Sequence, residues 1–436
     1  MGQIFHPYEP DQCHLFPPSP RDWMPEGHLA FFISETVEQL DLKPFYAKFR
    51  KRDSDRGSLA YDPRMLLKAL IYSYSAGIFS SRKIAAGIDD LVALRYLAGG
   101  NRPGHRTIAR FRRDNAANFA EVFRQVVRVA QDAGLVDLGT LAIDGSKVKA
   151  NASKHKAMSY GRMKSEDKRL KKEISRIIEL AEETDSAEDE EFGPDFRGDE
   201  LPAELQNRES RRAKIREAVA ALKKEQAEKD AAANRGKGRK KKLKRANGTP
   251  PDDAQYNFTD PESRIMKTAS GGFDQCFNAQ IAVDAKQQII VGSGVTPSAA
   301  DVGELIPTLD KAEMVTGLKA KHLLADAGYK SEANLAALED RNVDAYVSLG
   351  RREETREKAK NAGPATERMH RKLNTKQGRK RFKARKHVVE PVFGWAKQVL
   401  GFRSFSMRGL KLAQAEWDLI CLCTNLRRMN NLISWA

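Results

Sequence analysis

Residues 140–154 read TLAIDGSKVKANASK, where a single acidic residue follows a short apolar run. Leu141, Ala142 and Ile143 predict a buried β-strand, and Asp144 then precedes a glycine and several lysines. An Asp-Gly pair commonly forms a turn. A carboxylate held at the end of a strand can instead bind a metal ion. The neighbouring residues leave both interpretations of Asp144 open.

Asp326 repeats this pattern, since it also ends a short apolar strand in HLLADAGYKS. Two such carboxylates close together would repel each other and would be costly to bury without a cation. Mg²⁺ prefers oxygen ligands. Two ions about 3.5–4 Å apart can activate an attacking oxygen and stabilise the leaving oxygen of a phosphodiester. This chemistry needs neither His nor Cys.

Glu390 is the candidate for a third carboxylate. It precedes Pro391 near the predicted start of an amphipathic helix, and Lys397 lies two turns later on the same face. Together they could hold a metal ion and a phosphate. The alternative is a solvated acid favoured by the helix dipole, and spacing alone favours that alternative.

Composition narrows the class of partner. The 436 residues carry 76 Lys and Arg against 59 Asp and Glu, a net charge of +17, which points to nucleic acid. No apolar run approaches the roughly 20 residues that span a membrane, and the N-terminus lacks the apolar core of a signal peptide. We therefore expect a cytoplasmic protein without a membrane partner. The four Cys form no zinc pattern, and no nucleophile elbow, phosphate loop or dinucleotide fingerprint occurs.

The chain divides by composition into several segments. Residues 1–25 are a Pro-rich arm, and 26–136 have helical periodicity with Gly-containing turns. Basic residues at the breaks between those helices suggest a helix-turn-helix-like DNA-binding domain, although a plain helical bundle with solvated arginines fits equally well. These residues are Arg82, Lys83, Arg110, Arg112 and Arg113.

A charged segment interrupts the catalytic part of the chain. Residues 155–255 have few large apolar residues and predict charged helices that could form a hairpin. A run with eight basic residues at 235–245 follows them and could bind phosphates. Strands and helices then alternate, and Ser298–Asp301 resembles a capping box that opens a helix. Residues 137–154 and 256–436 therefore predict one mixed α/β domain, a sheet with flanking helices.

The chain resembles bacterial insertion-sequence transposases of the DDE class, whose catalytic domain is like ribonuclease H. The matching stretches are LAIDGSKVKANASK, FNAQIAVD, VTPSAADVGEL, LLADAGYKS and VVEPVFGWAK, together with YDPRMLLKALIYSYSAGIFSSRKIA and GHRTIARFRRDN in the helical part. The resemblance implies a catalytic triad of Asp144, Asp326 and Glu390, with Lys397 as the family's lysine. It also implies Mg²⁺ or Mn²⁺, as two ions bound by the triad.

The resemblance further implies contacts with DNA. Lys147 and Lys149 would face the backbone beside Asp144. Relatives often carry a Tyr and an Arg before the Glu, where this chain has Lys383 and Lys386, and Arg385 joins this basic group. The change removes aromatic stacking and a bidentate phosphate contact.

The expected function is metal-dependent cleavage and strand transfer of an insertion sequence. The DNA partners would be its terminal inverted repeats and a target duplex, bound by a homodimer or larger assembly at the bacterial nucleoid. Two rival functions use the same residues or fewer of them. One is a metal-dependent nuclease without strand transfer, and the other is a non-catalytic DNA-binding protein.

Overall fold

The computed structural model describes residues 19–47, 59–192, 203–234, 246, 248–268, 271–350 and 363–433. The basic run at 235–245 and most of the predicted N-terminal arm lie outside these ranges. Two compact units are present, Met1–Ala150 with Phe277–Ala436 and Asn151–Cys276. Along the described ranges, no helix is long and apolar enough to cross a membrane.

The first unit begins with short helices, as the periodicity predicts. They are α1 (Leu29–Glu38), α2 (Lys43–Tyr46), α3 (Pro63–Ser75), α4 (Ser81–Asp90), α5 (Val92–Leu97), α6 (His105–Asp114) and α7 (Ala116–Asp132). Pro63 lies at the first position of α3, where its missing N–H costs nothing, and the Asp62 carboxylate accepts a hydrogen bond from the Arg64 N–H. These helices share one compact unit with the sheet, so their separation as a domain of 26–136 stays a proposal.

A mixed sheet forms the centre of this unit. Its strands are β1 (Thr140–Lys149), β5 (Phe273–Asp284), β6 (Ile289–Thr296), β7 (His322–Ala325) and β8 (Asp344–Val347). The strands follow the order β5-β1-β7-β8, and β6 pairs with β5. The pairs β1–β7 and β7–β8 are parallel, whereas β5–β6 is an antiparallel hairpin. The predicted mixed α/β fold is confirmed.

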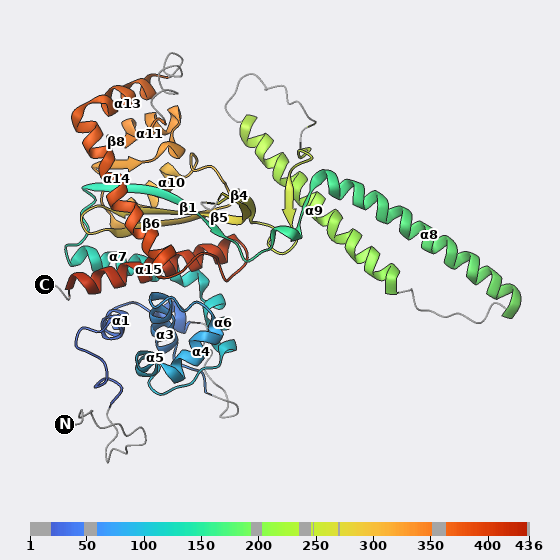
Figure 1. Cartoon of the computed structure of the whole chain (residues 1–436), viewed down its shortest axis with the longest axis horizontal. Helices are drawn as coiled ribbons and strands as arrows, with labels where there is room; N and C mark the ends of the chain where they lie inside the picture. Colours follow the sequence, from blue (N-terminus) through green and yellow to red (C-terminus); the bar gives the residue numbers. More distant parts are fainter. Residues whose placement is uncertain are drawn as a thin grey trace, which may run out of the picture. The chain divides into compact units, whose positions relative to one another are not determined.

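Helices cover both faces of this sheet (Figure 1). They are α10 (Leu305–Thr316), α11 (Glu332–Asp340), α13 (Pro364–Asn374), α14 (Lys376–Gly394) and α15 (Leu410–Ile433). Helix α15 is deeply buried along most of its length, and it packs against α3, α7 and β6. Apolar side chains of α15 such as Trp417, Leu419 and Leu422 therefore join the N-terminal helices to the sheet.

A buried polar chain also ties α15 to the N-terminal helices. The Glu416 carboxylate is fully buried and accepts a hydrogen bond from the Tyr74 hydroxyl at 2.9 Å. The Arg112 guanidinium in turn donates to the Tyr74 oxygen at 2.7 Å and to the Phe79 carbonyl at 2.9 Å. Since buried charges are tolerated only when paired and hydrogen-bonded, this chain fixes α3, α6 and α15 against each other.

The second unit is built around two long helices. It contains η1 (Lys154–Lys156), β2 (Ala157–Ser159), α8 (Tyr160–Phe192), α9 (Ala203–Asn234), β3 (Gln255–Asn257) and β4 (Arg264–Lys267). The helices α8 and α9 pack together over an apolar core that includes Met163, Leu170 and Ile215. Strand β2 pairs with β3, and β4 pairs with the first residues of β5. The expected helical hairpin is confirmed.

Asp418 on α15 is a buried acid inside the first unit. Its Oδ1 atom accepts hydrogen bonds from the Ser293 hydroxyl at 2.5 Å and the Gln414 amide at 2.7 Å. Burial raises the pKa of this carboxyl to about 6, against the smaller lowering effect of these hydrogen bonds and of Lys311 and Arg124. Folding therefore favours the protonated form of Asp418.

We expect Asp418 to make the protein less stable as pH rises from about 4 to about 6. The folded-state pKa lies roughly 2 units above the unfolded value, so the loss should approach roughly 3 kcal/mol. Asp418→Asn should flatten this part of the pH dependence, as measured by urea unfolding across pH 4–7. The exposed Asp310→Asn change serves as control, and equal slopes in the wild type and Asp418→Asn would contradict the expectation.

Candidate active site

Two of the predicted carboxylates lie side by side because β1 and β7 are parallel neighbours. Their register runs from Thr140↔His322 to Ile143↔Ala325, so Asp144 and Asp326 are the next residues along the two strands. Adjacent strands lie about 4.8 Å apart, and partners in register point to the same face. The negative charge of Asp326 accordingly acts on Asp144.

Asp144 lies within β1 and forms an ion pair, so it is not a turn residue. Its Oδ2 atom accepts a hydrogen bond from Arg385 Nη1 at 2.8 Å, and its Oδ1 atom accepts one from the Gly145 N–H at 2.8 Å. Burial raises the pKa of the Asp144 carboxyl, and the charge of Asp326 adds to this effect. Arg385 and the Gly145 N–H act in the opposite direction.

Asp326 follows β7 and caps the short 3-10 helix η2 (Ala327–Tyr329). Its Oδ1 atom accepts a hydrogen bond from the Gly328 N–H at 2.8 Å. The end of the parallel strand and this cap together fix the carboxylate at the same edge of the sheet as Asp144.

Glu390 is exposed and lies deep inside α14 rather than near a helix start. The expected helix begins at Lys376, so the interpretation of Glu390 as an acid favoured by a helix N-terminus is wrong. Lys397 follows in a π-helical turn, Trp395–Val399. Its ammonium group contacts the Ser146 hydroxyl and donates to the Lys147 carbonyl at 3.3 Å, which places it against β1 beside Asp144.

Pro391 explains a further contact of this helix. Proline has no N–H, so the His387 carbonyl loses its usual partner four residues later. The Gln288 side-chain amide at the tip of the β5–β6 hairpin donates to that carbonyl at 2.7 Å. A sheet residue thus replaces the missing helical hydrogen bond and anchors α14 one turn before Glu390.

The chemistry of the predicted triad suits a divalent cation, because hard ions prefer carboxylate oxygens. Within the described ranges, no three His, Cys, Asp or Glu side chains are already gathered around one point. Asp144 and Asp326 are neighbours, Glu390 extends to solvent, and Asp144 holds Arg385. Sharing one ion among all three would require Glu390 and Arg385 to reorient.

Asp301 is a fourth acidic residue at this site. We expected it to cap a helix, but α10 begins only at Leu305. Instead the Asp301 Oδ1 atom accepts hydrogen bonds from three side chains. They are Lys147 Nζ at 3.1 Å, Asn278 Nδ2 at 2.6 Å and Gln280 Nε2 at 2.9 Å. Gln280 also accepts a hydrogen bond from the buried Tyr329 hydroxyl.

The glycines that follow Asp144 and Asp326 make room for Asp301 and Gln280. A Cβ atom on Gly145 would lie 2.3 Å from Gln280 Nε2 and 2.8 Å from Asp301 Oδ1, closer than real contacts allow. A Cβ atom on Gly328 would lie 3.1 Å from both Asp301 Oδ2 and Asp326 Oδ1. The glycines of the motifs DG and DAG are therefore the sequence feature that reflects the close approach of Asp301 to the two strand ends.

Comparison with known families identifies the family of the chain. The family model described as "Transposase DDE domain" matches residues 245–426, which include Asp301, Asp326, Glu390 and Lys397. The model described as "Transposase domain (DUF772)" matches residues 18–114, the N-terminal helices. The chain belongs to the DDE transposases of insertion sequences. No curated protein and no solved structure matches it.

This membership makes the protein a transposase that acts on DNA, and its family generally uses divalent metal. The matches favour neither the plain nuclease nor the non-catalytic DNA-binding protein. They support the mixed α/β fold described above.

The basic residues predicted to bind DNA fall into two groups. Several are exposed and could reach a phosphate: Arg82, Lys83, Arg110, Arg113, Lys149, Lys383 and Lys386. The side chains of the other three form hydrogen bonds or ion pairs within the transposase. Arg112 is only 8% exposed and holds Tyr74, Lys147 is bonded to Asp301, and Arg385 is bonded to Asp144. We therefore remove Arg112 from the proposed DNA contacts.

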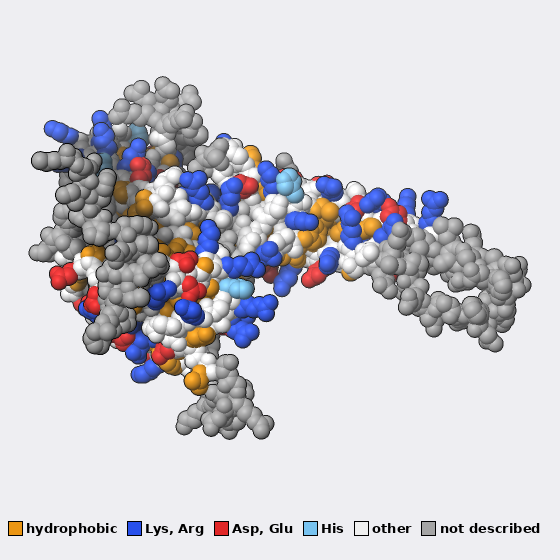
Figure 2. All heavy atoms as spheres, turned by 60° about the horizontal axis from the view of Figure 1, so that its bottom comes forward, with side chains coloured by type: hydrophobic (Ala, Val, Ile, Leu, Met, Phe, Trp, Pro, Cys, Tyr) orange, Lys and Arg blue, Asp and Glu red, His pale blue; other side chains and the backbone are white. Residues whose placement is uncertain are grey.

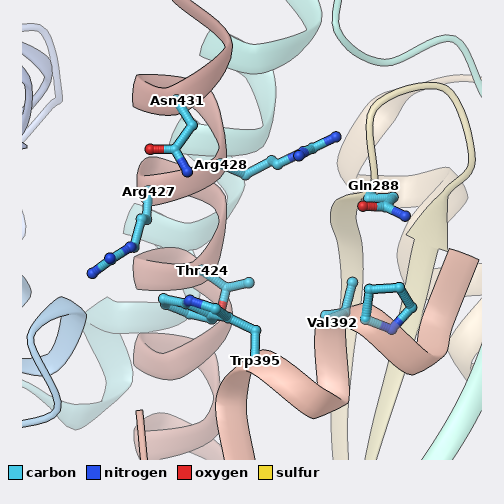
Figure 3. A pocket seen from close by; sticks show the side chains of 8 residues that line it. Gln288, Val392, Trp395, Thr424, Arg427, Arg428 and Asn431 are labelled. Atoms are coloured by element: carbon cyan, nitrogen blue, oxygen red, sulfur yellow. The ribbon is translucent and has the colours of Figure 1, made fainter. Parts of the chain in front are cut away.

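A pocket of about 200 Å³ lies beside α14 in the transposase (Figure 3). Pro391, Val392 and Trp395 line it from α14 and the π-helical turn, and Gln288 lines it from the hairpin tip. The remaining lining residues come from α15 and are Thr424, Arg427, Arg428 and Asn431. The Arg427 guanidinium lies 5.6 Å from the centre of the Trp395 ring, a cation–π contact that joins α15 to this turn.

We expect Asp301→Asn to reduce strand cleavage by about 10- to 100-fold, the size typical of changes to the polar residues that surround a metal site. The new amide would carry no charge to balance Lys147. Its NH2 group is a donor and cannot accept the hydrogen bonds of the Asn278 and Gln280 amides. Single-turnover cleavage of labelled DNA measures this effect. Asp310→Asn on the surface of α10 is the matched control, and unchanged cleavage by Asp301→Asn would exclude this role.

Proposed function

We propose that Asp144, Asp326 and Glu390 hold two divalent cations, Mg²⁺ or Mn²⁺, and that the transposase uses them for DNA cleavage and strand transfer. The observation that carries this proposal is the register of β1 and β7, which makes Asp144 and Asp326 neighbours at one edge of the sheet. When bound, such ions activate an attacking oxygen and stabilise the leaving oxygen of a phosphodiester.

Two reactions follow one another at the proposed site. In the first, water attacks a phosphorus atom at the element's end, a new P–O bond forms, and the P–O3′ bond breaks to leave a free 3′-OH. In the second, this 3′-OH attacks a phosphorus atom of the target DNA, and the target's own P–O3′ bond breaks. Each step exchanges one P–O bond for another, so no protein–DNA bond is needed.

Basic residues around the carboxylates would hold the DNA. Lys397 lies against β1 beside Ser146 and could contact a phosphate next to the reacting one. Lys149, Lys383 and Lys386 are exposed and could contact the backbone further away. Lysines act there as point charges, so these contacts would position the duplex without reading its sequence.

The exposed arginines and lysine of α4 and α6 are proposed to recognise the terminal inverted repeats. Arg82 and Lys83 lie in the first turn of α4, and Arg110 and Arg113 lie on α6. Because transposition joins two ends, we propose a homodimer or larger assembly on DNA at the bacterial nucleoid.

We expect Asp144→Asn, Asp326→Asn and Glu390→Gln each to lower strand cleavage in Mg²⁺ by at least about a thousandfold, because each removes a charged ligand. The changes conserve shape, and circular dichroism checks that each variant stays folded, because Asp144→Asn removes the counter-charge of the largely buried Arg385. Cleavage and joining are measured separately on labelled element ends with target DNA. Asp340→Asn, an exposed acid on α11, is the control and should remain active.

The outcomes separate the proposal from its rivals. Cleavage without joining by the wild-type protein would indicate a nuclease. Full activity in any one triad variant would remove that residue from the site. DNA binding with neither reaction would support the non-catalytic alternative.

A further inference from the structure

The helical hairpin of the second unit separates its charges by sign. Between Lys164 and Arg176, every acidic side chain of α8 pairs with an arginine of α9. The pairs are Glu166 with Arg211 at 2.9 Å, Asp167 with Arg212 at 2.9 Å and with Arg216 at 3.2 Å, and Glu173 with Arg208 at 3.3 Å. The acids of α8 therefore face α9 and neutralise the inner side of the hairpin.

The opposite side of α8 carries only positive charge over this stretch. Lys168, Lys171, Lys172 and Arg176 are exposed, and within the described part of the chain no ion pair involves them. Their spacing of three and four residues places them on one face, away from the buried Leu170 and Ile174. Figure 2 shows Lys and Arg side chains along the hairpin labelled α8 and α9 in Figure 1, with Asp and Glu side chains among them. We call these four residues the α8 cationic face.

An ordinary solvated helix surface does not have this arrangement. Such surfaces intersperse both signs, because like charges three and four residues apart destabilise a helix by about 0.2–0.5 kcal/mol per pair. Lys168 and Lys172 form one such pair, and Lys172 and Arg176 form another. Between Lys164 and Arg176 the acids of α8 are all paired on its other side, and the next described acid, the exposed Glu179, lies beyond this stretch. A polyanionic partner would relieve this repulsion.

We propose that the α8 cationic face binds the sugar–phosphate backbone of duplex DNA without reading its sequence. Residues 168–176 cover about 12 Å along the helix axis, enough to follow several phosphates of one strand. Three of the four residues are lysines, which act as point charges and lack the planar fork that reads guanine edges. The inference rests on the transposase acting on DNA and assigns a role to the charged insertion.

The test uses the full chain with Lys168→Gln, Lys171→Gln and Lys172→Gln combined. Binding to a labelled duplex of arbitrary sequence is measured by fluorescence anisotropy between 50 and 200 mM salt. Each lost phosphate contact lowers the slope of log K against log salt by about 0.9, so we expect the slope to fall by about 2–3. At the lowest salt, affinity should fall at least about tenfold.

A matched variant removes the same charge from the other helix. Lys214, Lys223 and Lys224 are exposed on α9, and the combined change of all three to Gln should alter the slope by less than about 1. Equal losses in the two variants would show diffuse attraction and overturn the proposal, as would an unchanged slope in the α8 variant. Circular dichroism checks that both variants keep their helices.

A second readout separates this inference from the proposed catalysis. At saturating DNA the α8 variant should cleave element ends at the wild-type rate, because its substitutions lie outside the triad. Loss of cleavage at saturation with normal binding would overturn the assignment of this face to DNA binding alone.

Discussion

The parallel pairing of β1 with β7 is the constraint on which the active site depends. Four register pairs, ending at Ile143 and Ala325, determine that the next residues on both strands are aspartates with side chains on one face. Backbone hydrogen bonds hold this spacing, and buried apolar side chains on both strands prevent a slip, because a shift by one residue would move Leu141 and Ile143 to the opposite face, where the small Ala142 is packed. The carboxylates are thus brought together by forces that do not involve them, and their mutual repulsion is the cost of that placement.

The polar residues around the aspartates offset part of this cost. Asp301 is itself acidic, but three donors converge on one of its oxygens, and Lys147 supplies the balancing charge. The two glycines let this group approach both strand ends. The same logic recurs at Glu416, where backbone and hydroxyl donors surround a fully buried carboxylate. Several convergent hydrogen bonds therefore stabilise the acids Asp301 and Glu416 inside this protein.

Local sequence pattern predicted the elements and the first two aspartates, because strand periodicity and the apolar run before each Asp are properties of a few consecutive residues. It could not predict contacts between distant residues. In the sequence, Asp301 resembles part of a helix cap. Its actual hydrogen-bond partners lie 154, 23 and 21 residues away along the chain. Arg112 carried the same signal as Arg110 and Arg113, and only packing against Tyr74 makes it internal. Glu390 was expected near a helix start because proline usually ends or opens helices, whereas Gln288 lets α14 continue through Pro391.

In the ion pair between Arg385 and Asp144, the guanidinium of the protein itself balances the charge of the carboxylate. The Arg385 guanidinium is largely buried, and its Nε atom has no hydrogen-bond partner among the described residues. Its charge, rather than a full set of hydrogen bonds, therefore accounts for its position. Any ion that occupies Asp144 must release this arginine, and the released cation would emerge from α14 a short distance from the carboxylate it had covered. A nearby backbone phosphate would be its natural new acceptor. The binding of metal and the binding of nucleic acid would then favour each other.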